Sequence, residues 1–156
     1  HYSSTHLNPT FSTAPLLTIP HQSVSIAQFG WEGKQLEIKG FGYLIPKGNI
    51  LGVVFDSEIF PESSPTTRLS VMMREPNQEE ALSHIKKVLR IEKDPIYRSL
   101  TTAHRAIPQY PVGFDHILEE LHAKKRETRF IGSSYTGVSV NECIRAAKKA
   151  ANSFTL

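Results

Sequence analysis

The sequence predicts a mixed α/β fold of the α+β type, in which an antiparallel sheet with one helix precedes a C-terminal strand, glycine loop and helix. Three observations indicate this class. Apolar residues alternate in short segments over residues 24–73, they recur at helical spacing over residues 77–89, and a glycine-rich loop opens into an amphipathic helix near the C-terminus. This order predicts two structural parts, residues 1–100 and residues 101–156.

The composition is that of an ordinary globular chain, with 156 residues, 39% hydrophobic residues and a formal net charge of +3. Neighbouring glutamates dilute its densest basic cluster, residues 124–129, so we expect no nucleic-acid partner. The single cysteine excludes an internal disulfide, and the seven histidines lack the spacing of metal ligands, so no metal site is expected. The chain begins at His1 without an initiating methionine, and we expect it to be part of a longer polypeptide.

Four strands are expected in the first part, because apolar and polar residues alternate there with turn residues between the segments. The expected strands are residues 24–29, 36–45, 50–55 and 68–73. Lys47-Gly48-Asn49 reads as a hairpin loop between the middle two strands, and Trp31-Glu32-Gly33-Lys34 reads as the turn before them. Consecutive strands joined in this way predict an antiparallel meander.

A helix follows, for which Asn77 is the expected N-cap and Glu80 completes the capping pattern. The apolar stripe expected to be buried consists of Ala81, Leu82, Ile85, Val88 and Leu89. Asp94-Pro95 is expected to end the helix. An extended stretch over residues 96–106 and a helix starting near Asp115 come next.

The C-terminal region predicts a binding loop. The apolar run Arg129-Phe130-Ile131 predicts a strand, residues 132–137 predict a glycine loop, and residues 138–151 predict a helix. The first turn of a helix leaves backbone N–H groups unpaired at the positive end of the dipole, which favours an electron-rich ligand. Gly132 and Gly137 have P-loop spacing, but Val138-Ser139 stands where lysine and serine or threonine are needed, so a flat heteroaromatic edge fits better than a triphosphate.

The apolar stripe of this final helix contains small residues that allow close approach to a sheet. Its members are Val140, Cys143, Ile144, Ala147, Ala150 and Ala151. The alternative is an ordinary amphipathic C-terminal helix. Cys143 lies on the stripe and reads as a small buried hydrophobe, not as a nucleophile.

Four motifs follow one another in a recognisable order and spacing. They are Gly40–Pro46 (GFGYLIP), Leu51–Ser57 with Phe60-Pro61, Ala106–Tyr110 (AIPQY) with Gly113, and Gly132–Ile144. Together they resemble the protoporphyrinogen oxidases, flavoenzymes of the flavin amine oxidase superfamily, over residues 16–153. The last motif is shared across the superfamily, whereas GFGYLIP and IPQY narrow the resemblance to this family.

The resemblance implies that residues 1–100 are part of a substrate-binding domain and that residues 101–156 return into a Rossmann-like FAD-binding domain. The residues that match the cofactor-binding segments are Gly132, Gly137, Val138, Ser139, Val140, Thr102 and Ala103. Those that match the wall of the tetrapyrrole pocket are Phe41, Gly42, Leu44, Val54, Met72 and Ile107. Backbone N–H groups of residues 138–140 would face the pyrimidine end of the flavin. For Leu44, Val54 and Met72, ordinary core packing would give the same pattern.

The implied activity is that of an oxidoreductase in haem biosynthesis, which oxidises protoporphyrinogen IX to protoporphyrin IX with hydride transfer to flavin N5 and dioxygen as the acceptor. No catalytic base is expected in this chain, because the cofactor carries the redox chemistry. The G-x-G-x-x-G fingerprint is absent, since Gly40-Phe41-Gly42 lacks the third glycine. We therefore expect a C-terminal part that is inactive alone and whose partner is the N-terminal part of the same polypeptide.

GFGYLIP and IPQY look more like the mitochondrial than the plastid type, so the mitochondrial inner membrane is the expected location. Membrane association and a homodimer are further expectations from the family. Two alternatives remain open at this point. One is another member of the flavin amine oxidase superfamily that acts on amines or carotenoids, and the other is a non-catalytic truncated product that binds a partner or a porphyrin.

Overall fold

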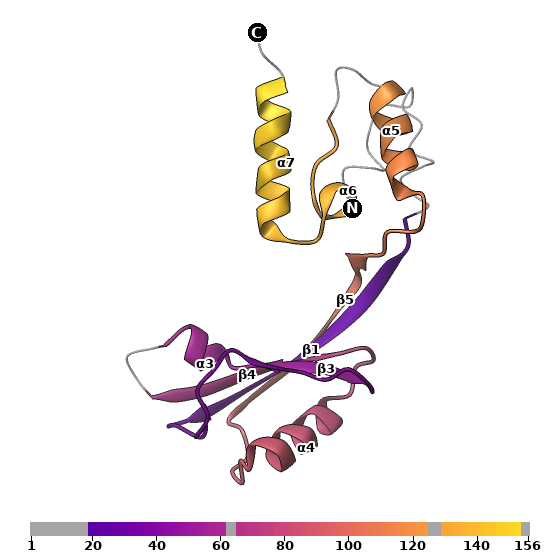
Figure 1. Ribbon diagram of the computed structural model, residues 1–156. Coiled ribbons are helices and arrows are strands. Elements are labelled where there is room, and N and C mark those ends of the chain that lie inside the picture. The colour runs from indigo at the N-terminus through magenta and orange to yellow at the C-terminus, as the bar shows by residue number, and fades with distance from the viewer. Residues whose placement is uncertain (1–18, 62–64, 125–128, 154–156) are drawn as a thin grey trace. The chain divides into compact units, whose positions relative to one another are not determined.

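The computed structural model describes residues 19–61, 65–124 and 129–153. Its strands are β1 (His21–Glu32), β2 (Gly42–Leu44), β3 (Ile50–Val54), β4 (Thr66–Met73) and β5 (Tyr97–Pro108). Its helices are α3 (Asp56–Ile59), α4 (Gln78–Leu89), α5 (Phe114–Lys124), α6 (Ser133–Thr136) and α7 (Val140–Ser153). The expected mixed class with an antiparallel sheet and helices is confirmed (Figure 1).

The described residues form two compact units, one that lies within residues 23–104 and one that combines residues 19–22 with described residues from 105 to 153. The first unit contains the sheet, α3 and α4. The second contains α5, α6 and α7. Each unit is described by itself.

The sheet has the strand order β2-β3-β4-β1-β5. Strands β2, β3 and β4 form the expected antiparallel meander, but β1 pairs with β4 instead of lying beside β2, so the meander prediction is wrong for the first strand. Alternation assigns residues to faces of a strand and does not identify the neighbouring strand. Trp31, expected in a turn, lies in β1 and is buried, and its indole N–H donates to the carbonyl oxygen of Lys93 at 3.0 Å.

The predicted second strand is much shorter than expected, because only Gly42–Leu44 pairs with β3. Residues 34–41 lie outside any strand. Gly40 and Gly42 have φ values of 153° and 143°, a region of backbone space that side-chain-bearing residues avoid. The backbone of the GFGYLIP motif therefore departs from regular strand geometry before Gly42–Leu44, the segment that pairs with β3.

Helix α4 packs on one face of the sheet and begins as predicted, with the side chain of Asn77 accepting a hydrogen bond from the backbone N–H of Glu80 at 3.1 Å. The core joins α4 to the sheet through Ala27, Phe29, Trp31, Leu36, Ile50, Val53, Phe55, Leu69, Val71, Met73, Ala81, Leu82, Ile85 and Ile91. Two details were predicted wrongly. Val88 is exposed, and the helix ends at Leu89 because Arg90 takes the left-handed conformation, well before Asp94-Pro95.

The C-terminal unit differs from the prediction in two respects. Residues 129–131 are not in a strand, and the glycine loop contains the short helix α6. A strand needs a partner edge, and none pairs with this segment among the residues that the structure describes. No residue of α7 is buried, and Val140 and Ile144 are 74% and 61% exposed, so the expected burial of its stripe is not observed. In the described ranges no helix has the length and apolar character needed to cross a membrane.

Candidate functional site

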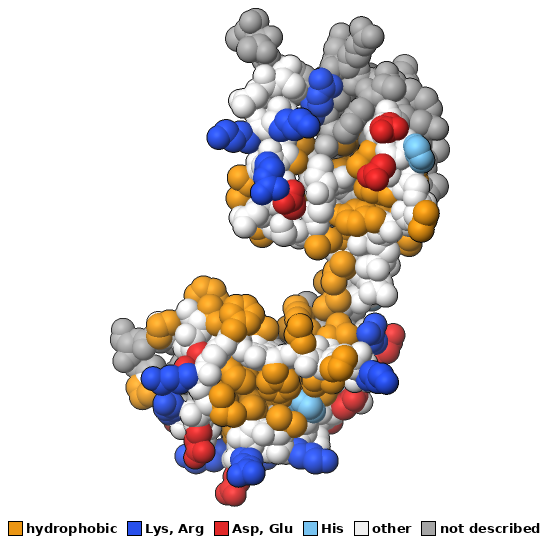
Figure 2. Space-filling view, in the orientation of Figure 1, with side chains coloured by type: hydrophobic (Ala, Val, Ile, Leu, Met, Phe, Trp, Pro, Cys, Tyr) orange, Lys and Arg blue, Asp and Glu red, His pale blue; other side chains and the backbone are white. Residues whose placement is uncertain are grey.

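The sheet has a face opposite α4, which we call the open face. Residues of β4 alternate in burial, with Leu69, Val71 and Met73 in the core beneath α4 and Ser70 and Met72 pointing the other way. Figure 1 shows α4 on one side of the sheet and α3 on the other. Hydrophobic side chains gather along the margin of this unit that carries α3 (Figure 2). The open face is therefore a surface with both apolar and polar side chains that the chain covers only in part.

One row of residues crosses the open face and is apolar. The strand register aligns Leu44 of β2 with Gly52 of β3, Gly52 with Met72 of β4, and Met72 with Ile26 of β1. Leu44 is 81% exposed, whereas Met72 and Ile26 are partly exposed. We call these four residues the apolar row. Ile26 is a member that the sequence singled out only as part of an expected strand.

Two glycines set the shape of the open face on β2 and β3. A Cβ atom on Gly42 would lie 2.1 Å from the carbonyl oxygen of Val53 and 3.0 Å from the Cα atom of Val54, and its φ is 143°. A Cβ atom on Gly52 would lie 2.7 Å from the carbonyl oxygen of Tyr43 and 3.1 Å from the side chain of Leu44. Only glycine fits at these two positions, and because it has no side chain the surface is recessed there between the neighbouring side chains.

The next row, two residues further along the strands, is apolar at Val54 of β3 and polar beyond it. Val54 aligns with Ser70 of β4, and Ser70 aligns with Gln28 of β1. The hydroxyl of Ser70 donates to the carboxylate of Asp56 at 2.7 Å, and the hydroxyl of Ser99 donates to the amide oxygen of Gln28 at 3.2 Å. We call Asp56, Ser70, Gln28 and Ser99 the polar row. It was missed from the sequence, because only the register brings these residues together.

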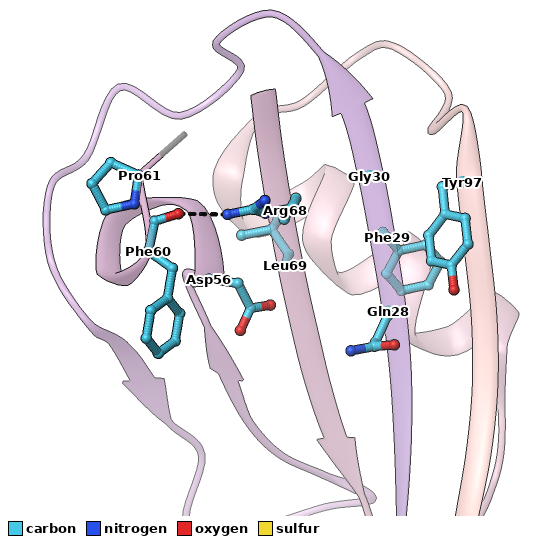
Figure 3. Close-up of a pocket in the computed structure, with 9 residues that line it drawn as sticks. All are labelled: Gln28, Phe29, Gly30, Asp56, Phe60, Pro61, Arg68, Leu69 and Tyr97. Atoms are coloured by element: carbon cyan, nitrogen blue, oxygen red, sulfur yellow. Dashed lines mark hydrogen bonds between the residues drawn. The ribbon is translucent and has the colours of Figure 1, made fainter. Parts of the chain in front are cut away.

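A cavity of about 550 Å³ lies at one end of the open face, and Asp56 and Gln28 of the polar row are part of its lining (Figure 3). Phe60 and Tyr97 stand on opposite sides of it, with Asp56 and Gln28 between them. The guanidinium of Arg68 donates to the carbonyl oxygen of Phe60 at 2.5 Å, which fastens the segment after α3 to the sheet. This volume is in the range of small-molecule sites.

The open face brings together four of the six residues that matched a tetrapyrrole wall. Gly42 and Val54 align with one another across β2 and β3, next to the apolar row that contains Leu44 and Met72. Phe41 precedes β2 and is 72% exposed. Ile107 belongs to the other unit, so it is not part of the open face of the first unit, and its side chain is 38% exposed.

Thr102 and Ala103 belong to β5 and, as neighbours in a strand, point to opposite faces. The hydroxyl of Thr102 lies 3.0 Å from that of the fully buried Ser25, which places Thr102 on the α4 side. Ala103 is exposed and lies on the open face. Thus one of the two residues shares a face with the apolar row.

The glycine loop of the C-terminal unit is arranged around Gly132 and Gly137, whose φ values are 115° and 130°. Ser139 caps α7, because its hydroxyl accepts from the N–H of Glu142 at 3.1 Å. Val138 and Val140 are 57% and 74% exposed. Within the described part of the chain, no acceptor bonds the backbone N–H groups of residues 138–140. These amides remain available to a ligand, as the first turn of a helix predicts.

Tyr110 of the IPQY motif supports this loop. Its hydroxyl donates to the carbonyl oxygen of Ser133, and its ring lies 4.8 Å from that of Phe114, measured between centroids. Burial raises the pKa of Tyr110, and the hydroxyl, which is protonated at neutral pH, acts as the donor in this bond. Tyr110 was recognised in the sequence as part of a motif but not as a residue that positions the loop.

No family model matches the sequence. The chain is 33% identical over 162 aligned residues to protoporphyrinogen oxidase of Bos taurus and 30% identical over the same length to that of Homo sapiens, covering 87% of this chain and 34% of each relative. It also superposes on a candidate protoporphyrinogen oxidase from Exiguobacterium sp. 255-15 with a TM-score of 0.75 and 20% identity, covering 98% of this chain and 39% of that one. The chain spans about a third of the length of the curated relatives that it matches.

Proposed function

Because the homology to protoporphyrinogen oxidases extends over most of this chain, we propose that it is the C-terminal part of an enzyme that oxidises protoporphyrinogen IX to protoporphyrin IX. The observation that carries the proposal is the open face. Four residues that match the family's tetrapyrrole wall lie on it, although alternation alone would allow them to be scattered through a core. A broad face with apolar side chains and with glycines in its recesses suits a broad macrocycle.

The proposed cofactor is FAD, and the glycine loop fits the edge of its ring. The fit rests on the unbonded amides of residues 138–140 and on Gly137, where a Cβ atom would lie 3.2 Å from Cγ of Glu142. When bound, the flavin would accept hydride from the reduced macrocycle. The amides would stabilise negative charge at the pyrimidine end, and Ser139 holds the helix that presents them. Dioxygen is the proposed final acceptor.

The proposed partner is the N-terminal part of the same polypeptide, which would supply the pyrophosphate-binding fingerprint and the basic residue for a substrate propionate. The exposed apolar stripe of α7, in which Val140 and Ile144 are open to solvent, is consistent with such a partner. We place the enzyme in an organelle, supported by a plant relative named "Protoporphyrinogen oxidase 2, chloroplastic/mitochondrial", and within it in the mitochondrial inner membrane.

The test is expression of the complete reading frame that encodes this chain, followed by a flavin absorbance spectrum and a porphyrin fluorescence assay. We expect bound FAD, and porphyrin formation that requires dioxygen. Leu44→Ala should raise KM for protoporphyrinogen, because Leu44 is exposed on the open face. Lys47→Ala, in the neighbouring hairpin loop, is the matched control and should leave KM unchanged. Protein that carries FAD but oxidises only amines or carotenoids would favour another member of the superfamily.

A further inference from the structure

The polar row lies on the open face between the apolar row and two aromatic rings. The apolar row, with Leu44 and Met72, is on one side. On the other side are the rings of Phe60 and Tyr97 at the cavity, and Arg68, whose guanidinium donates to the carbonyl oxygen of Phe60, lies between them. Rows two residues apart on a strand are separated by about 6.6 Å. A macrocycle that extends from the apolar row to these rings would therefore place its centre over Asp56 and Gln28.

The polar row presents acceptor oxygens on Asp56 and Gln28, and the amide nitrogen of Gln28 is a donor. The hydroxyls of Ser70 and Ser99 donate to Asp56 and Gln28, which fixes the orientation of both acceptor groups. One hydrogen bond leaves most of the lone pairs of a carboxylate unused. Among the residues that line the cavity in the described structure, Asp56 supplies the carboxylate, and it is partly exposed to the cavity (Figure 3).

The centre of a reduced tetrapyrrole has the complementary chemistry. In a porphyrinogen every pyrrole nitrogen carries a hydrogen and is a donor. In the oxidised porphyrin half of these nitrogens have lost the hydrogen and present lone pairs, which a carboxylate repels. An acceptor-only group beneath the ring centre would thus bind the reduced ring more tightly than the oxidised one, and hydrogen bonds to charged groups are strong enough to matter.

We propose that the carboxylate of Asp56, held by Ser70 and assisted by Gln28, accepts hydrogen bonds from the pyrrole N–H groups of the substrate and discriminates the porphyrinogen from the porphyrin product. This inference rests on the proposed function. It assigns to Asp56 a role in specificity that favours entry of the reduced ring and release of the oxidised one.

The experiment uses the product of the complete reading frame with bound FAD. It measures KM for protoporphyrinogen IX and the inhibition constant for protoporphyrin IX in wild type and in Asp56→Asn. The amide keeps an acceptor for Ser70 but adds a donor that suits the unprotonated nitrogens of the porphyrin. We expect the ratio of inhibition constant to KM to fall about tenfold. Glu58→Gln neutralises another acid of α3 that does not line the cavity, and it should leave the ratio unchanged.

The outcomes are distinguishable. Wild-type protein that forms no porphyrin would overturn the proposed function and this inference together. An active wild type whose ratio is unchanged in Asp56→Asn would overturn the inference alone, as would an equal change of both constants, which a purely structural role predicts. If Asp56→Asn loses its flavin or fails to fold, Gln28→Met, on an exposed side chain of the same row, must lower the ratio several-fold for the inference to stand.

Discussion

Replacing Gly42 by alanine should destabilise the sheet unit strongly, and for two separable reasons. First, φ at Gly42 is 143°, where a residue with a Cβ atom is strained by about 1–3 kcal/mol. Second, the added Cβ atom would lie 2.1 Å from the carbonyl oxygen of Val53, well inside contact distance, and this oxygen belongs to the backbone of β3 and cannot rotate away. The strands must then separate at the pair formed by Gly42 and Val54.

A matched control isolates the second reason. Gly48 also has a positive φ, 107°, but a Cβ atom there would meet nothing within 4 Å. Gly48→Ala should therefore lower the free energy of unfolding only through backbone strain, by about 1 kcal/mol. Gly42→Ala should lower it by about 3 kcal/mol or more, because overpacking against β3 adds about 1–3 kcal/mol to the strain. The difference between the two variants measures the close approach of β2 to β3.

The assay is equilibrium urea unfolding of the 156-residue chain, followed by circular dichroism, with both variants and wild type at the same protein concentration. A lower midpoint with an unchanged slope indicates lost stability of the same folded state. Equal midpoints for Gly42→Ala and Gly48→Ala would refute the argument, because they would show that β2 moves aside at no cost.

Three further predictions concern the rest of the chain. Burial lowers the pKa of His84, whose Nε2 lies 3.0 Å from the hydroxyl of Tyr43. Below about pH 6.5 the unfolded state therefore binds more protons than the folded state, and the free energy of unfolding should fall as the pH drops below that value. Urea titrations at pH 7.5 and 5.5 test this, and His84→Gln should remove the dependence. In the complete protein, Gly137→Val should weaken flavin retention, because the side chain would meet Glu142 at a φ of 130°, and unchanged flavin occupancy after gel filtration would count against the proposed ring-edge site. Tyr110→Phe removes the hydrogen bond to the glycine loop and should lower flavin affinity about fivefold to tenfold with little change in the unfolding midpoint; a variant with wild-type flavin affinity would show that the loop does not need this support.

Local signals in the sequence predicted the elements that depend on local physics. The cap at Asn77, the helix that follows it and the burial of Ala81, Leu82 and Ile85 were all predicted correctly. The end of that helix was missed, because a left-handed Arg90 carries no signal in residue type. The expected burial of the α7 stripe, with Ile144 as an example, failed for another reason. A periodic pattern predicts which face of a helix can be buried but does not supply the element that covers it.

The strand order explains why the polar row could not be predicted. In an antiparallel meander β1 would have paired with β2, and Gln28 would have been separated from Ser70 by two strands. Because β1 pairs with β4, Gln28 lies opposite Ser70, and Ser70 in turn reaches the carboxylate of Asp56 at the start of α3. The strand order that local sequence patterns did not predict is therefore the one that brings Gln28 and Ser70 beside the carboxylate of Asp56, where a reduced tetrapyrrole would present its donors.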